Sequence, residues 1–126
     1  MKKTLLIILV CILAVGVLAS CDNKNTSLAN EINKAYESGA PMSYEEVKSK
    51  LPLGTIWVGY DSDNGKSGVL CYVEGINSQE AFDVMIESIK AGASYEGIIV
   101  RIVNNKAVKA AGDRLDYAAY QALRQN

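Results

Sequence analysis

Histidine is absent from the 126-residue chain, which also has only one Trp, one Phe and two Pro. Without histidine, histidine-dependent catalytic triads, the common zinc sites and the usual proton shuttle are excluded. Paired carboxylates could still support hydrolysis. However, Glu45, Glu46, Asp113 and Asp116 sit where acidic residues favour helix starts. The sequence therefore predicts a domain that is not an enzyme and uses no cofactor or metal, with a divergent histidine-free hydrolase as an alternative.

The chain also lacks an excess of charge of either sign. Thirteen Lys and Arg residues against 14 Asp and Glu give a formal charge of −1. Nucleic-acid-binding domains usually carry a clustered basic face, and lipid headgroups are often bound by polybasic segments. Neither pattern occurs, so we expect no nucleic-acid partner and no second, electrostatic attachment to a membrane.

The first 20 residues do carry a strong pattern. Lys2 and Lys3 precede an apolar run over residues 5–17, and small residues follow it. A membrane-spanning helix needs about 20 apolar residues, whereas this run is shorter and is soon followed by polar Asp22. These features are typical of a secretory signal peptide, so residues 1–20 are predicted to be removed.

The sequence Leu18-Ala19-Ser20-Cys21 resembles the lipobox of bacterial lipoproteins. This resemblance implies that a diacylglycerol is attached to the Cys21 thiol and that cleavage occurs just before it. Acyl chains such as palmitate contribute about 0.8 kcal/mol per buried CH₂ to membrane binding, and two chains anchor a protein stably. We expect an extracytoplasmic protein, held at the periplasmic face of the inner membrane by Asp22 if the envelope is double. The alternative is an ordinary signal peptide with an unrelated cysteine.

Residues 21–27 are small and polar and are predicted to form a lipid-anchored tether. Residues 28–126 are long enough for a single domain. Once Cys11 is removed with the signal and Cys21 is lipidated, Cys71 is left without a disulfide partner. Its apolar surroundings, Val69-Leu70-Cys71-Tyr72-Val73, favour a buried strand position over a nucleophile.

Periodicity in the remaining chain predicts helices and strands in the order ααββαββα. A helix ends near Gly39, and Ser43 with Glu46 forms a capping box that starts the next one. Strands are expected over 55–60, 69–73, 98–103 and 106–111, a third helix over 79–91, and a last helix capped by Asp113. We therefore predict an α+β domain in two layers, with two hairpins forming a four-stranded antiparallel sheet and the helices on one face.

The segment between the first two strands contains Asp61, Asp63 and Gly65, which resembles the start of a calcium-binding loop. An EF-hand would require Asp or Asn, Gly and Glu where Gly65, Lys66 and Tyr72 occur. Asn64-Gly65 is instead a strong hairpin signature. The sequence therefore favours a turn without a metal.

Three aromatic residues form the remaining candidate site. Trp57 alternates with Ile56 and Val58, which places it on the opposite side of the sheet from them. If the helices leave one face open, Trp57 with Tyr60 or Tyr72 could form an interaction patch, because such residues anchor protein interfaces. The alternative is that Trp57 belongs to the core.

Residues 42–47, Met-Ser-Tyr-Glu-Glu-Val, resemble the helix start of small envelope lipoproteins of the β-lactamase-inhibitor-like and outer-membrane-assembly (SmpA/OmlA) groups. The helix expected over 79–91, between the two strand pairs, departs from those families, and no functional residue is carried over. We expect a non-catalytic module that is attached to a membrane by lipid and binds another envelope protein. A small-ligand or inhibitor-type domain is the alternative.

Overall fold

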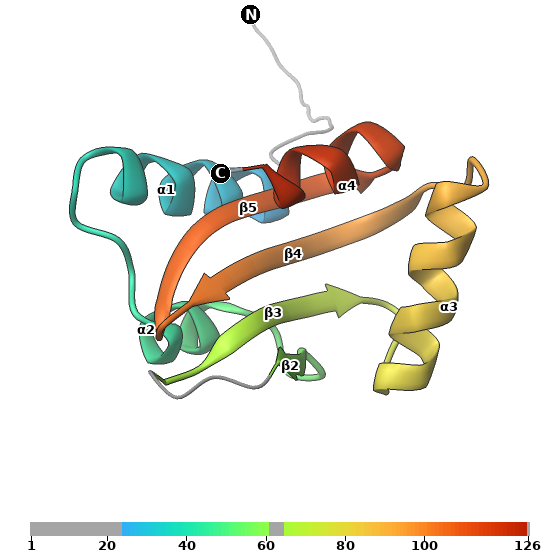
Figure 1. Cartoon of the computed structure of the whole chain (residues 1–126), viewed down its shortest axis with the longest axis horizontal. Helices are drawn as coiled ribbons and strands as arrows, with labels where there is room; N and C mark the ends of the chain where they lie inside the picture. The colour runs from blue at the N-terminus through green and yellow to red at the C-terminus, as the bar shows by residue number, and fades with distance from the viewer. Residues whose placement is uncertain (1–23, 61–64, 126) are drawn as a thin grey trace, which may run out of the picture.

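The computed structural model describes residues 24–60 and 65–125. Its elements follow the order ααββαββα and its four strands form one antiparallel sheet, β2-β3-β4-β5, as Figure 1 shows. The predicted α+β class, element order and sheet are confirmed. The elements are α1 (Lys24–Glu37), α2 (Tyr44–Lys50), β2 (Ile56–Tyr60), β3 (Ser67–Val73), α3 (Gln79–Lys90), β4 (Tyr95–Val103), β5 (Lys106–Leu115) and α4 (Tyr117–Arg124).

The helices cover both faces of the sheet, so the expectation of two layers with helices on one face was wrong. Leu70 packs in a cluster with residues of α1 and α2, whereas Val69 and Cys71 pack in a second cluster with residues of α3 and α4. The physical reason lies in β3 and β4, which are apolar at consecutive positions. A strand that is apolar on both faces must be covered on both.

Helix α1 covers the outer edge of β5. The Asn33 side chain accepts a hydrogen bond from the Ala110 N–H at 2.8 Å and donates one to the Ala110 carbonyl at 3.0 Å. The amide thus occupies backbone groups that would otherwise be open to another strand. The opposite edge strand of the sheet is β2.

Helix α1 begins earlier than the sequence suggested, because residues 24–27 of the predicted tether form its first turn. Gly112 of β5 explains this extension. A Cβ on Gly112 would lie 2.2 Å from the Asn25 carbonyl oxygen, so only glycine lets the helix start approach the strand this closely. Residues 21–23 are what remains of the predicted tether, and they lie outside the described residues.

The predicted cap of α2 is confirmed, because the Ser43 hydroxyl accepts a hydrogen bond from the Glu46 N–H at 3.1 Å. The helix is held to the turn between β4 and β5. The Tyr44 N–H donates to the Asn105 carbonyl at 2.7 Å, and the Ala107 N–H donates to the Met42 carbonyl at 2.8 Å.

The last helix starts later than predicted. Asp113 lies within β5 with φ of 83°, and Asp116 caps α4 by accepting a hydrogen bond from the Ala119 N–H at 3.0 Å. The expectation for Asp113 was wrong because β5 continues to Leu115, whose side chain is fully buried among residues of α3 and α4. Within the described residues, no helix is long and apolar enough to span a membrane.

Candidate functional site

The structure separates the residues that the sequence singled out. Cys21 lies outside the described residues, as do Asp61 and Asp63 of the possible calcium loop. Trp57 and Tyr72 pack against the same core cluster, on the face covered by α1 and α2. Tyr60 ends β2 opposite Ser67, and its side chain is outside the described part of the structure. The open sheet face on which the patch was predicted does not exist, because helices cover both faces.

Trp57 is half-buried at the edge of the core. Its ring meets the buried Tyr44 ring of α2 edge-on, with centroids 5.1 Å apart and planes at 77°, an arrangement that aromatic pairs prefer. The indole leans along β2 over Gly59, where a Cβ would lie 2.6 Å from the indole nitrogen. Trp57 therefore belongs partly to the core and partly to the surface.

Two lysines surround this aromatic pair. The Lys66 ammonium lies 4.9 Å from the centre of the Tyr44 ring and 5.5 Å from that of Trp57. Lys48 approaches Tyr44 at 5.7 Å. Both distances to Tyr44 fall within the range of cation–π attraction, which contributes about 0.5–1 kcal/mol at exposed sites. We refer to Tyr44, Trp57, Lys48 and Lys66 as the aromatic–lysine cluster.

Tyr72 lies beside the turn that leads into β2. A Cβ added to Gly54 would lie 3.8 Å from the Cε1 atom of the Tyr72 ring. The Thr55 N–H donates to the Pro52 carbonyl at 3.3 Å, and Gly54 has φ of 96°, which together are typical of a type II turn. This turn presents Leu53 at its tip with 99% of its surface exposed.

The electrostatics of the aromatic–lysine cluster favour an acidic partner. Lys48 and Lys66 are both exposed, and neither forms an ion pair within the described residues. Within the same described segments, no hydrogen-bond acceptor engages the Trp57 indole nitrogen. A half-exposed indole with the Lys66 ammonium over its ring, and with Lys48 beside the neighbouring Tyr44, can bind a carboxylate next to an apolar side chain.

Chemistry that needs a clustered set of ligands has little support in the described chain. No group of three or more Cys, Asp and Glu residues within it could hold a metal ion. Cys71 is fully buried in β3, and burial raises the pKa of its thiol to about 12. Because a thiolate is the reactive form, this thiol is inert at neutral pH, and the prediction that Cys71 is a core residue is confirmed.

A groove of about 470 Å³ lies on the other face of the sheet, between α3 and α4. We refer to it as the α3–α4 groove. Apolar side chains from β3, α3 and α4 line it. Two acidic residues and two arginines complete the lining. The lining residues are Val69, Phe82, Asp83, Ile86, Glu87, Arg101, Tyr120, Leu123 and Arg124.

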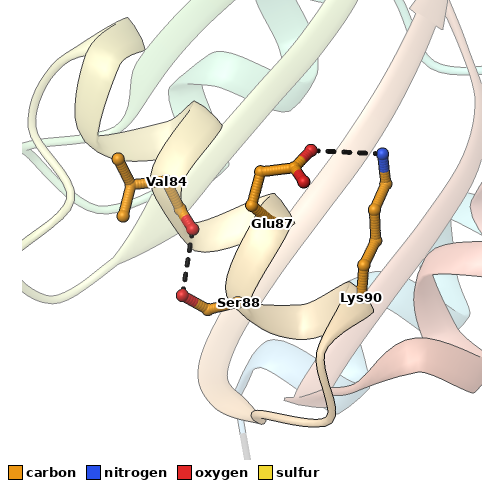
Figure 2. A network of polar contacts seen from close by, with 4 residues as sticks. All are labelled: Val84, Glu87, Ser88 and Lys90. Atoms are coloured by element: carbon orange, nitrogen blue, oxygen red, sulfur yellow. Dashed lines mark hydrogen bonds and ion pairs between the residues drawn. The ribbon is translucent and has the colours of Figure 1, made fainter.

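Short polar contacts link residues along α3, the helix that lines one side of this groove, as Figure 2 shows. Glu87 forms an ion pair with Lys90 at 3.3 Å, and the Ser88 hydroxyl donates to the Val84 carbonyl at 3.0 Å. Lys90 also lies 5.8 Å from the Tyr120 ring of α4, and the Arg124 guanidinium lies 5.6 Å from the same ring. Cations from both helices thus lie near the Tyr120 ring.

Sequence reasoning identified Trp57 and Tyr72 but missed Leu53 and the two lysines of the cluster. A Pro-Leu-Gly turn directly before a strand indicates an outward leucine, and this pattern could have identified Leu53. No local pattern joins Lys48 to Lys66, because α2 and β3 meet only in the folded chain.

The α3–α4 groove also has no sequence signature, since its lining comes from four separate elements. A scan against models of known protein families and searches among curated proteins and solved structures find no match to this chain.

Proposed function

We propose that this protein is a non-catalytic envelope lipoprotein, anchored through a lipidated Cys21, whose domain binds another envelope protein. The observation that supports the binding role best is the aromatic–lysine cluster, in which the Lys66 ammonium lies over both Tyr44 and half-exposed Trp57 and Lys48 approaches Tyr44. Neither lysine forms an ion pair with a described residue. Exposed Leu53 lies in the turn that leads into β2, the strand that carries Trp57. An acidic segment with an apolar side chain is the partner chemistry that fits.

The position of the cluster is compatible with an anchored domain. The start of α1, three residues after Cys21, packs against Gly112 of β5. Trp57 lies on β2, at the opposite edge of the sheet. Three strand spacings of about 4.8 Å separate these edges by roughly 14 Å. A short tether at the β5 edge therefore leaves the β2 edge accessible to a partner in the envelope.

The anchor is tested by metabolic labelling with a palmitate analogue in bacteria that express the full chain. The wild type should incorporate the label and remain with the membrane fraction. The Cys21→Ala variant should lose both the label and the membrane association. Label that survives in this variant would contradict lipidation at Cys21.

The interaction is tested by photo-crosslinking in intact cells. A photoreactive amino acid is placed at position 53, at position 66 or, as a control, at position 84. Val84 is a suitable control because it is a large exposed apolar residue on α3. Positions 53 and 66 should capture the same protein, and position 84 should not.

Charge reversal then tests the role of the lysines. Lys48→Glu combined with Lys66→Glu should abolish the adduct at position 53, because the acidic partner would meet two carboxylates in place of two ammonium groups. Lys34→Glu, at an exposed position of α1, is the matched control and should leave the adduct intact. No common adduct, or one that survives the double reversal, would contradict the proposed interface.

A further inference from the structure

The α3–α4 groove combines an apolar surface with opposite charges on its two walls. Phe82 and Ile86 of α3 are half-buried along it, and Leu123 of α4 is buried. A lining of this type with a few placed polar groups is the usual composition of small-ligand sites, which measure about 300–1,000 Å³. The groove volume of about 470 Å³ falls within that range.

The acidic wall carries one carboxylate that the fold leaves available. Asp83 and Glu87 are four residues apart on α3 and therefore share one side of the helix. Glu87 is paired with Lys90, whereas Asp83 forms no ion pair with any described residue. Two like charges at this spacing weaken a helix slightly, and a bound cationic group would relieve their repulsion.

Two guanidinium groups also line the groove, one from the sheet and one from α4. Arg101 of β4 donates to the Leu123 carbonyl near the end of α4 at 3.4 Å, which orients it beside the groove. Arg124 is exposed and lies against Tyr120. No ion pair within 4.0 Å joins Arg124 to Asp83 or Glu87. Among the described residues, Asp83 of α3 and Arg124 of α4 thus line the same groove without forming an ion pair with each other.

We propose that the α3–α4 groove binds a short apolar peptide with free termini. The peptide ammonium group pairs with Asp83, its terminal carboxylate pairs with Arg124 beside Arg101, and its apolar side chains cover Phe82, Ile86 and Leu123. A fatty acid or another apolar anion fits less well, because it supplies no cation to the acidic wall. This site lies on the opposite face of the sheet from Trp57 and is independent of the proposed interface.

The test uses the full chain, expressed in bacteria and reconstituted in phospholipid nanodiscs, with tri-leucine as the probe in calorimetric titrations. Free tri-leucine should bind with one-site stoichiometry. N-acetylation or C-amidation of the peptide should each weaken binding about tenfold, because each removes one charge-assisted contact. No binding up to about 10 mM, the millimolar end of the affinity scale, would overturn the proposal.

Two variants assign the peptide ends to the two walls. Asp83→Asn should weaken free tri-leucine about tenfold and leave the N-acetylated peptide unaffected, since that peptide already lacks the ammonium group. Arg124→Gln should weaken free tri-leucine about tenfold and leave the C-amidated peptide unaffected, since that peptide already lacks the terminal carboxylate. Glu80→Gln on α3 and Arg114→Gln on β5 are matched exposed controls and should change neither affinity. Equal losses for free and capped peptides would overturn the assignment, and unchanged Trp57 fluorescence verifies that each variant is folded.

Discussion

Replacement of Asn33 by Ala would reopen the β5 edge of the sheet. The Asn33 side chain forms two hydrogen bonds with the backbone of Ala110, at 2.8 and 3.0 Å, across 77 residues of sequence. Ala110 is only 5% exposed, so water reaches its N–H and carbonyl groups poorly once the amide is gone. The substitution therefore leaves one donor and one acceptor unpaired at a largely buried position.

The size of the effect follows from these two groups. Leaving a buried donor or acceptor unsatisfied costs about 1–3 kcal/mol each. Alanine has a higher helix propensity than asparagine, which offsets about 0.5 kcal/mol of this loss in stability. The net loss in the free energy of unfolding for Asn33→Ala is therefore expected to be about 1.5–5.5 kcal/mol. For a domain of this size, each kcal/mol of that loss lowers the melting temperature by about 4–8 °C.

Urea unfolding, followed by the fluorescence of the single Trp, measures this loss. Asn30→Ala is the matched control, because Asn30 is an exposed residue of the same helix and gains the same propensity. The control should be neutral or slightly stabilised. If the two variants differ by less than about 0.5 kcal/mol, the range of ordinary surface substitutions, then Asn33 does not hold α1 to β5 and the reasoning is refuted.

Other features of the fold lead to further predictions. The raised pKa of the buried Cys71 thiol, about 12 against a usual 9.0, keeps it protonated in the folded state while the unfolded thiol ionises above pH 9. The stability that this provides is complete below pH 9 and is lost by up to about 1.4 kcal/mol per pH unit as the pH rises toward 12, a decline that Cys71→Ala should reduce in urea titrations. In the folded wild type, a thiol reagent at pH 8 should leave Cys71 unmodified, and rapid labelling without unfolding would contradict its burial. Gly112→Ala should destabilise the domain by about 1–3 kcal/mol and increase hydrogen exchange in the first turn of α1, because the new Cβ would overlap the Asn25 carbonyl. Asp116→Ala should lower the free energy of unfolding by about 1 kcal/mol, because α4 loses its cap. Asp113→Ala should change hydrogen exchange of the α4 amides no more than an ordinary surface substitution does.

For the candidate site, the sequence was informative only where the residue type and its local pattern indicate a role. The alternation of Trp57 with Ile56 and Val58 predicted that they face opposite sides of the sheet, and the structure places those two neighbours in the opposite core cluster. The two lysines of the aromatic–lysine cluster were not predictable. Their ammonium groups meet Tyr44 and Trp57 because α2 is held against the β4–β5 turn by backbone hydrogen bonds.

The sequence by itself determined the order of the elements, the antiparallel sheet, the cap of α2 at Ser43 and the buried position of Cys71. Each of these rests on local chemistry: periodicity, turn residues and side chains that bond within one helical turn. Tertiary structure alone decided which face each helix covers, where α1 begins and where β5 ends. Those outcomes depend on contacts between distant residues, such as Gly112 with Asn25, Asn33 with Ala110, and Leu115 with the α3–α4 layer. Because no local pattern encodes such contacts, an open sheet face was expected where the folded protein has helices on both sides.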